Sequence, residues 1–495
     1  MGHGGLERRV GRLLVVGLPA GPLSPDWERR FCDLAPSGVI LFGRNVESPD
    51  VVSSLIRRLQ DLAAAGGFSP LLVCADEEGG FLSPILGPSD PAPAAMAVGS
   101  VGSSPLAFEA ARVVGGRLRR VGVNLNLAPC VDVNDEPRNP VIGPRSFGAD
   151  PALVARLGAE TIRGLKAGGV LTTAKHFPGH GSTTTDSHVT LPVDGRSPSD
   201  LESSALGPFR AAVEAGVDLV MTAHVSFPAL TGRPDLPATL SEQIVGEWLR
   251  RRLAFRGVVI TDAMEMIAVT RVSFEEAALQ ALSAGADLVL YTLGDEVPWR
   301  VRDFLAGRVG RGPLAKERIE ERLRRIAALK EAVPERAPES SDRRVFDEIR
   351  RRAVTVLEDP GGLLPLALRR HSRVAVVVPN PGLSEGAIDV AAVVDALRQK
   401  RLEVEVVEAR PESSVSLGAL RGCDAGLVFT LSRGPLDPWQ AEITREAART
   451  LDRCIVVAAF NPWALPDLDR PAARLATYDF SPPSIRALVE RVFAA

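Results

Sequence analysis

The feature that most constrains this chain is an alternation of short apolar runs with longer segments of helical periodicity, which extends from Leu13 to Thr292. Continuous runs rich in Val, Ile and Leu are typical of parallel strands that are buried on both faces. The runs are Leu13–Leu18, Gly38–Phe42, Leu71–Asp76, Gly122–Ala128, Thr172–Phe177, Leu219–Val225, Gly257–Asp262 and Asp287–Tyr291. Eight strand–helix units of this kind predict an α/β fold that begins with a closed (β/α)8 barrel of the TIM type.

The rest of the chain predicts a second, smaller domain. A helical pattern over Ala315–Ala332 is followed by a stretch rich in Pro, Glu and Ser that is typical of a linker, over 334–342. Beyond it, apolar runs alternate with helical patterns, which predicts an open α/β sheet of about five strands. Four of these runs are Val374–Val378, Val404–Val407, Ala425–Thr430 and Ile455–Phe460. We therefore expect a TIM-barrel catalytic domain over 1–333 and a C-terminal α/β sandwich domain over 343–495.

Charge and cysteine content narrow the class of function. The 58 basic and 61 acidic residues give a net charge of −3, so no overall field favours nucleic acid or an anionic membrane as a partner. The five cysteines are scattered and form no CxxC pair, which predicts neither a disulfide framework nor a thiolate metal site. The apolar run near the N-terminus is too short for a signal peptide or a membrane span. We expect a soluble, cytoplasmic protein with a small or neutral ligand; no oligomeric state follows from the sequence.

Polar side chains collect at the carboxyl ends of the predicted strands. Asp76, Lys175, His176, His224 and Asp262 all lie at or near such an end, and in a TIM barrel these ends form the active-site face. A carboxylate in the position of Asp262 is able to attack an electrophilic carbon or to balance a developing cation. Acidic residues after strands also cap helices, so Asp262 alone does not decide the chemistry.

The densest chemical signal is a loop that follows the fifth predicted strand. His176, His180 and His188 fall within 13 residues, and the prolines and glycines between them exclude a regular helix. In one interpretation these histidines and Asp186 bind a metal ion. In another, Asp186 orients His188 and raises its pKa from the ordinary value of ~6.5, so that His188 delivers a proton near neutral pH. In a third, the histidines only fill polar corners of the loop.

Several motifs, taken in order, give the chain a resemblance to a known family. They are GVILFGRN, ADEEGG, NLAPCVDV, VIGPRSFG, KHFPGHG followed by DSH, and GVVITDAMEM. Together they resemble glycoside hydrolase family 3, and specifically its β-N-acetylglucosaminidase branch. The resemblance spans Leu13 to Tyr291 and continues more loosely through LLPL, NPWAL and ATYDFSPPSIRAL beyond the linker.

The resemblance implies a role for each matching residue. Asp262 matches the catalytic nucleophile, His188 the acid/base, and Asp186 the residue that orients and polarises that histidine. A further four positions, which hold the hydroxyls and the N-acetyl group of a terminal sugar, are matched by Asp76, Arg145, Lys175 and His176. The implied activity is that of a retaining exo-β-N-acetylglucosaminidase, with a carbohydrate substrate from cell-wall fragments or chito-oligosaccharides, a covalent glycosyl-Asp intermediate, some phosphorolysis, and neither metal nor cofactor.

Two positions depart from the family pattern. Ala263 stands where members often carry a second Asp, and Phe81 follows the Glu-Gly-Gly turn where Arg or Ile is common. The first removes a charge beside the nucleophile, and the second bears on contacts to the leaving group. The alternatives are a β-glucosidase or β-xylosidase of the same family, a barrel metallohydrolase, and a catalytically silent sugar-binding protein.

Overall fold

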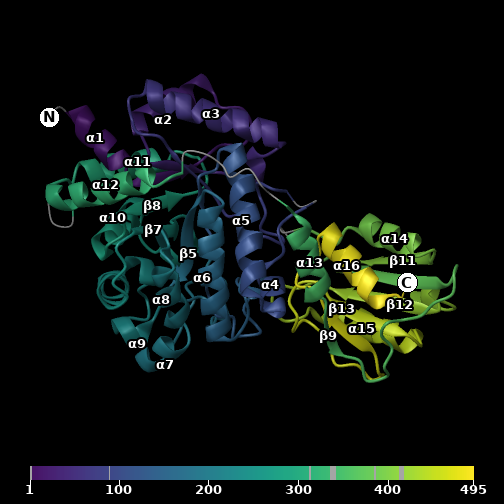
Figure 1. The fold of residues 1–495 in the computed structure, drawn as a ribbon. Coiled ribbons are helices and arrows are strands. Elements are labelled where there is room, and N and C mark those ends of the chain that lie inside the picture. Colours follow the sequence, from purple (N-terminus) through teal and green to yellow (C-terminus); the bar gives the residue numbers. More distant parts are fainter. Residues whose placement is uncertain are drawn as a thin grey trace.

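The computed structural model describes residues 3–87, 90–310, 314–334, 342–383, 386–411 and 417–494. In this part of the chain, eight parallel strands form a closed barrel, and six further strands form a separate sheet. Figure 1 shows the barrel with helices around it and the second sheet beside it, near the helices α4 (Ala95–Val101) and α13 (Arg344–Ala353). The prediction of a TIM-type barrel followed by a smaller α/β domain is confirmed. Most of the predicted linker, 335–341, lies outside the described residues.

The barrel strands follow one another in chain order, and β1 pairs with β8 to close the ring, with Val15 opposite Leu290. The strands are β1 (Leu14–Gly17), β2 (Gly38–Ile40), β3 (Leu72–Ala75), β4 (Leu125–Asn126), β5 (Leu171–Phe177), β6 (Leu219–Thr222), β7 (Val258–Ala263) and β8 (Leu288–Tyr291). Each overlaps one of the predicted runs. Almost every residue of these strands is buried, as expected for a parallel sheet that is covered on both faces.

Helices surround the barrel. They are α1 (His3–Gly11), α2 (Pro25–Leu34), α3 (Pro49–Ala65), α5 (Ser104–Val121), α6 (Pro151–Ala167), α7 (Pro198–Ser203), α8 (Leu206–Glu214), α9 (Pro228–Thr231), a π-helix (Gln243–Arg252), α10 (Phe274–Ala284), α11 (Val297–Ala306) and α12 (Lys316–Glu331). The start of α6 is typical: Asp150 caps it by accepting a hydrogen bond from the Ala152 N–H at 3.0 Å, and Pro151 occupies the first turn. No described helix is both long and apolar enough to cross a membrane.

The fourth strand is much shorter than predicted because side-chain amides replace part of its ladder. Asn124 accepts a hydrogen bond from the Val73 N–H at 2.8 Å. Asn126 accepts one from the Glu77 N–H at 3.0 Å and donates one to the Glu77 carbonyl at 2.9 Å. The buried Asn126 side chain thereby fixes the backbone of the segment that carries Asp76 and Glu78, one of the acidic walls of the site described below.

The second domain contains six strands in the order β11-β10-β12-β13-β14-β9, one more than the predicted five. The strands are β9 (Thr355–Glu358), β10 (Arg373–Pro379), β11 (Glu403–Ala409), β12 (Ala425–Thr430), β13 (Cys454–Ala458) and β14 (Ala473–Ala476). One apolar cluster packs this sheet against α14 (Val390–Gln399) and α16 (Pro482–Val492), and another packs it against α15 (Pro438–Thr450). The strand β9 lacks a continuous apolar run because it is a half-exposed antiparallel edge strand.

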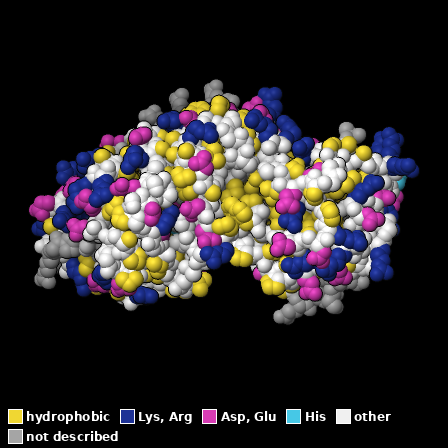
Figure 2. Space-filling view, turned by 90° about the horizontal axis from the view of Figure 1, so that it is seen from below, with side chains coloured by type: hydrophobic (Ala, Val, Ile, Leu, Met, Phe, Trp, Pro, Cys, Tyr) yellow, Lys and Arg dark blue, Asp and Glu magenta, His cyan; other side chains and the backbone are white. Residues whose placement is uncertain are grey.

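The two domains meet through an apolar contact. Met96 and Ala97 of α4 belong to one buried cluster with Ala353, Ala458 and Tyr478 of the second domain. Figure 2 shows the molecule from below, with hydrophobic side chains gathered in the recess between the two lobes and charges of both signs interspersed elsewhere on that face.

Candidate active site

A cavity of about 820 Å³ opens at the carboxyl ends of the barrel strands. It is lined by all seven residues that the sequence predicts for the site, namely Asp76, Arg145, Lys175, His176, Asp186, His188 and Asp262. They come from the ends of β3, β5 and β7 and from the loops that follow β4 and β5. The structure therefore brings together residues that are up to 186 positions apart in the chain.

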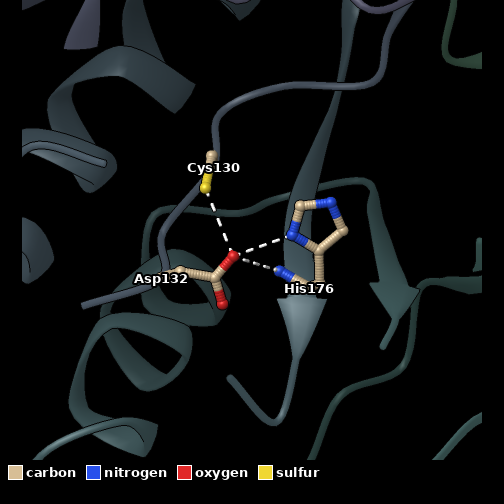
Figure 3. A group of neighbouring side chains, drawn as sticks. All are labelled: Cys130, Asp132 and His176. Carbon is tan, nitrogen blue, oxygen red and sulfur yellow. Dashed lines mark hydrogen bonds and ion pairs between the residues drawn. The ribbon is translucent and has the colours of Figure 1, made fainter. Parts of the chain in front are cut away.

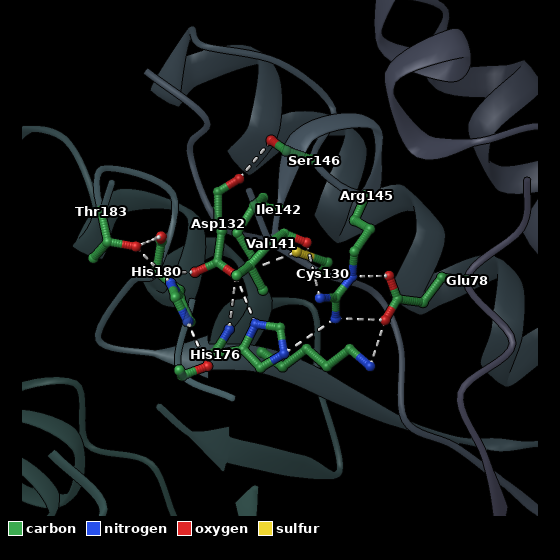
Figure 4. A network of polar contacts seen from close by, with 12 residues as sticks. Glu78, Cys130, Asp132, Val141, Ile142, Arg145, Ser146, His176, His180 and Thr183 are labelled. Atoms are coloured by element: carbon green, nitrogen blue, oxygen red, sulfur yellow. Dashed lines mark hydrogen bonds and ion pairs between the residues drawn. The ribbon is translucent and has the colours of Figure 1, made fainter. Parts of the chain in front are cut away.

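A network of paired charges forms one wall of this cavity (Figure 4). Arg145 binds Glu78 through two hydrogen bonds of 2.9 Å, and Lys175 Nζ lies 2.5 Å from both Asp76 Oδ1 and Glu78 Oε1. Burial opposes ionisation of Glu78, but the charges and hydrogen bonds of Arg145 and Lys175 outweigh it and lower the pKa of Glu78 to about 2. The network holds its donors and acceptors in place for a polar ligand.

We expect Glu78→Gln to lower the free energy of unfolding by about 3 kcal/mol at pH 7, because Lys175 and Arg145 then stay buried with less compensating charge. The contribution of Glu78 is complete above the ordinary glutamate pKa of ~4.3 and is lost as the pH falls toward about 2. Urea titration of the wild type and the variant measures the difference in the free energy of unfolding. Glu348→Gln, which breaks an exposed pair with Arg352, is the control and should cost ~0.5 kcal/mol or less. Equal losses in both variants would contradict the prediction.

The residue that positions two of the histidines was not among those predicted from the sequence. Asp132 is buried just beyond β4 and accepts hydrogen bonds from His176 Nδ1 at 2.8 Å, from the His176 N–H at 3.2 Å and from the His180 N–H at 2.7 Å. Because Nδ1 of His176 donates to Asp132, its Nε2 is left to accept from Arg145 Nη2, 3.2 Å away. The loop after β5 also packs closely on the segment after β4, since a Cβ at Gly181 would lie 1.8 Å from the Val133 carbonyl oxygen.

The structure gives little support to a metal site. Among the described residues, one group is compact enough to hold an ion: Cys130, Asp132 and His176, whose ligand atoms lie within 4.8 Å of one another (Figure 3). The predicted ligand Asp186 is not in it. Burial and the charge of Asp132 raise the pKa of the Cys130 thiol, whereas a metal requires the thiolate. Arg145 adds a positive charge beside His176. This donor set does not fit a metal ion.

His188 and Asp186 form a pair on the loop after β5. His188 Nδ1 lies 2.8 Å from Asp186 Oδ1, and the His188 backbone N–H donates to the same oxygen at 2.8 Å. The hydrogen bond that His188 donates to Asp186 raises the pKa of His188 against the opposing effect of partial desolvation, and the charges of Asp186 and Asp262 add to it. The His188 side chain is 65% exposed, so its second nitrogen is accessible from the cavity. The arrangement suits proton delivery to a bound ligand.

Asp262 ends the apolar part of β7 and accepts a hydrogen bond from the Ala263 N–H at 2.7 Å. Burial opposes its ionisation, but the neighbouring His176, His224 and Lys175, together with the Ala263 N–H, lower the pKa of Asp262 below its ordinary value. His224 is buried beneath it and binds the Ala263 carbonyl oxygen through Nε2 at 2.9 Å. Asp262 is therefore a carboxylate at neutral pH, as a nucleophile must be.

The second domain also contributes side chains to the cavity. Arg433 and Phe460 line it together with Phe81 of the barrel. The rings of Phe81 and Phe460 make an edge-to-face contact, with centroids 4.8 Å apart. Close packing also requires glycine two residues before Phe81, since a Cβ at Gly79 would lie 2.5 Å from the Pro93 carbonyl oxygen.

Comparison with known proteins agrees with this architecture. A family model described as the glycosyl hydrolase family 3 N terminal domain matches residues 6–329. A β-hexosaminidase from Xylella fastidiosa (strain M23) is 37% identical over 309 residues, which are 60% of this chain and 88% of that protein. A protein from Cellulomonas fimi named β-N-acetylglucosaminidase/β-glucosidase is 28% identical over 496 residues, 91% of this chain and 85% of its own length.

A solved structure extends the likeness to both domains. The glycoside hydrolase family 3 β-N-acetylglucosaminidase from Paenibacillus sp. strain FPU-7 is 33% identical to this chain, covers 98% of it with 95% of its own length, and superposes with a TM-score of 0.88. The match of the family model to the whole barrel and the likeness of both domains give the same assignment. The chain belongs to glycosyl hydrolase family 3 and is a glycoside hydrolase.

Proposed function

We propose that this protein is a retaining exo-β-N-acetylglucosaminidase that removes terminal β-linked N-acetylglucosamine. The observation that carries the proposal is the presence of an ionised carboxylate, Asp262, and a carboxylate-supported histidine, His188, in one cavity. The names of the relatives from Paenibacillus and Cellulomonas fimi support the sugar. We further propose that the enzyme acts in the cytoplasm, on cell-wall fragments or chito-oligosaccharides.

In the first step an oxygen of Asp262 attacks the anomeric carbon, and the bond from that carbon to the glycosidic oxygen breaks. Protonated His188 gives its Nε2 proton to the departing oxygen, so that the leaving group departs as a neutral alcohol. Asp76, Arg145, Lys175 and His176 bind the sugar and hold the anomeric carbon near Asp262. The products of this step are a covalent glycosyl-Asp262 ester, a neutral His188 and the free leaving group.

In the second step neutral His188 takes a proton from water as the water oxygen attacks the anomeric carbon. The ester bond breaks, Asp262 returns to its carboxylate form, and the sugar leaves with its original anomeric configuration. Two inversions at one carbon give this overall retention, and both histidine nitrogens return to their starting state.

The proposal is tested by comparing release of 4-nitrophenol from the N-acetyl-β-glucosaminide and from the β-glucoside, each with and without a chelator. We expect activity on the first substrate that the chelator does not reduce. Activity on the glucoside alone would favour the β-glucosidase alternative, which the double name of the Cellulomonas fimi relative keeps relevant. Loss of activity with the chelator would favour a metallohydrolase. Sugar binding without turnover on either substrate would favour the silent binding protein.

A prediction on pH dependence follows from the His188–Asp186 pair. The first step needs protonated His188, so kcat/KM falls as the pH rises through its pKa. Because the hydrogen bond and charge of Asp186 raise that pKa, we expect Asp186→Asn to move the basic limb of the kcat/KM profile to lower pH and to reduce kcat/KM at pH 7 by on the order of 10²-fold. Asp135→Asn, on the neighbouring loop, is the control and should leave the limb in place. An unmoved limb in Asp186→Asn would contradict this role.

We also expect phosphate to compete with water in the second step. After proton donation His188 is neutral, so it does not repel an anionic nucleophile as a carboxylate acid/base would. A phosphate oxygen then attacks the anomeric carbon and displaces Asp262, giving N-acetylglucosamine 1-phosphate. Phosphorus NMR of the products detects it, with sulfate at equal ionic strength as the control. Free sugar alone at high phosphate concentration would refute this expectation.

A further inference from the structure

A second cavity, of about 330 Å³, lies at the amino ends of the barrel strands, which is the face opposite the candidate active site. It is lined by Leu71 and Leu72 at β3, by Asn124 just before β4, and by Lys330 from the last turn of α12. Residues on this face of a TIM barrel serve stability more than catalysis. The reaction proposed above therefore gives no reason for an amine in this place.

Most polar side chains of this second cavity already have hydrogen-bond partners. Gln60 accepts from the Leu71 N–H at 2.9 Å and donates to the Leu71 carbonyl oxygen at 3.1 Å. Asn124 donates to that same carbonyl oxygen at 3.0 Å, and Arg119 donates to the Pro334 carbonyl oxygen at 2.7 Å. These side chains hold the surrounding backbone in place.

The amine of Lys330 lacks a counter-charge among the described residues. Its Nζ donates a hydrogen bond to Ser69 Oγ at 3.1 Å, and no carboxylate in this part of the chain lies within ion-pair distance of it. Asp61 lines the same cavity, but its charge does not contribute to the pKa of Lys330. Cys74 is also near the amine, but burial raises the pKa of that thiol, which is therefore uncharged at neutral pH.

These surroundings make Lys330 a neutral nucleophile. Burial and, more weakly, the charge of Arg12 lower the pKa of its amine to about 7. An ordinary lysine has a pKa of ~10.4, so the neutral fraction of Lys330 at pH 7 is on the order of 10³-fold larger. Lys166 shows the contrast, because its ammonium is paired with Asp218 at 2.5 Å. A neutral amine has the lone pair that attacks an electrophile.

Arg12, just before β1, has a polar atom without a partner. Its Nε is buried and makes no hydrogen bond within the described residues. A buried N–H without an acceptor costs free energy, and most such groups in native proteins are paired. Since the charge of Arg12 acts on the amine of Lys330, the two groups are neighbours. Two basic groups and the Ser69 hydroxyl therefore meet at a place that lacks an anion.

Carbon dioxide converts this amine into the missing anion. The nitrogen lone pair of neutral Lys330 attacks the carbon, an N–C bond forms, and one C=O π pair moves to oxygen. The nitrogen then loses a proton to the solvent, which leaves a carbamate with one negative charge. Its oxygens are acceptors for the Nε–H of Arg12 and the hydroxyl of Ser69. Acylation would consume the same amine but would leave Arg12 without an anionic partner.

We propose that Lys330 binds carbon dioxide as a carbamate, and that Arg12 and Ser69 hold this carbamate in the cavity at the amino ends of the strands. The carbamate joins α12 to the segments that lead into β1 and β3, so carbon dioxide stabilises the barrel. This inference does not depend on the proposed function, because no step of glycoside hydrolysis uses this face.

The test traps the carbamate on the full chain. The protein is equilibrated at neutral pH with bicarbonate that carries a heavy carbon isotope, and triethyloxonium ion then converts the carbamate into a stable ethyl carbamate. Mass spectrometry of the peptides locates the label. We expect labelling of Lys330 to exceed that of Lys166 by at least about 10-fold. Arg12→Met should reduce the label at Lys330 by about 10-fold, because it removes the guanidinium partner and raises the pKa of the amine.

A second measurement concerns stability. Bicarbonate should raise the melting temperature of the wild type by about 2 °C relative to chloride at equal ionic strength and pH. Lys330→Gln should lose this shift. Lys316→Gln, at an exposed lysine in the first turn of the same helix, is the matched control and should keep the shift.

Two results would overturn the inference. Equal labelling of Lys330 and Lys166 would show that the amine has no special reactivity. Equal stabilisation by chloride and bicarbonate, without label at Lys330, would show a site for any small anion. The labelling comparison is made within the wild-type chain, so it decides the question even if Lys330→Gln does not fold.

Discussion

We expect Asp262→Ala to lower kcat for 4-nitrophenyl N-acetyl-β-glucosaminide by about 10⁴-fold or more, the largest effect of any single substitution in this chain. The reason is that Asp262, the proposed nucleophile, would form the bond to the anomeric carbon, and the next residue, Ala263, has no group that could replace it. Stopped and continuous assays of 4-nitrophenol release in the steady state measure this loss of kcat.

Azide separates a nucleophile from a residue that only maintains the structure. The small anion fits the space that Asp262→Ala creates, and it should restore turnover of an activated aryl glycoside by forming the α-glycosyl azide. Asp235→Ala, at an exposed carboxylate paired with Arg233, serves as the control and should change kcat less than about twofold. If Asp262→Ala kept a hundredth of the wild-type rate, or gave no azide product, Asp262 would not be the nucleophile.

We expect His188→Ala to lower kcat/KM by on the order of 10³-fold on N,N′-diacetylchitobiose, because the sugar alkoxide is a poor leaving group without a proton. The loss should be far smaller on a 2,4-dinitrophenyl glycoside, whose leaving group is stable as an anion. The basic limb of the pH profile should also disappear, since it reports deprotonation of His188. A series of aryl glycosides with leaving groups of increasing pKa measures the difference.

His371→Ala is a suitable control, because His371 is an exposed histidine of the second domain that does not line the cavity. It should leave both substrates and the pH profile unchanged. An equal loss on the activated and the unactivated substrate in His188→Ala would show that His188 positions the sugar without transferring a proton.

The parts of this fold that the sequence predicts are those with a local signal. Each barrel strand is a buried apolar run, and residues such as Asp262 and Lys175 stand out because a charge directly follows or ends such a run. The His188–Asp186 contact is also local, because only one residue separates the two. A contact between two neighbouring residues of one loop can therefore be predicted before the fold is known.

The site residues that were missed, such as Glu78 and Arg433, all make contacts with residues distant in the chain. Glu78 could have been predicted as a site residue, because it follows Asp76 at a spacing of two and therefore lies on the same face of an extended segment. Glu77, between them, points the other way and accepts hydrogen bonds from the Ile85 and Leu86 N–H groups at 3.0 and 3.2 Å. Arg433 had no such signal. Its position depends on how the second domain packs against the barrel, which no pattern near residue 433 specifies.

Residues of both domains line the cavity, and this affects how the specificity of such an enzyme can change. The side chains to which we assign bond breaking belong to the barrel, whereas part of the cavity is lined by a loop of the second domain that one buried amide, Asn461, ties to the barrel. Variation in the loop that carries Arg433 can therefore change part of the cavity lining while the side chains of the barrel stay the same. That loop is a tractable starting point for engineering transfer of N-acetylglucosamine to new acceptors.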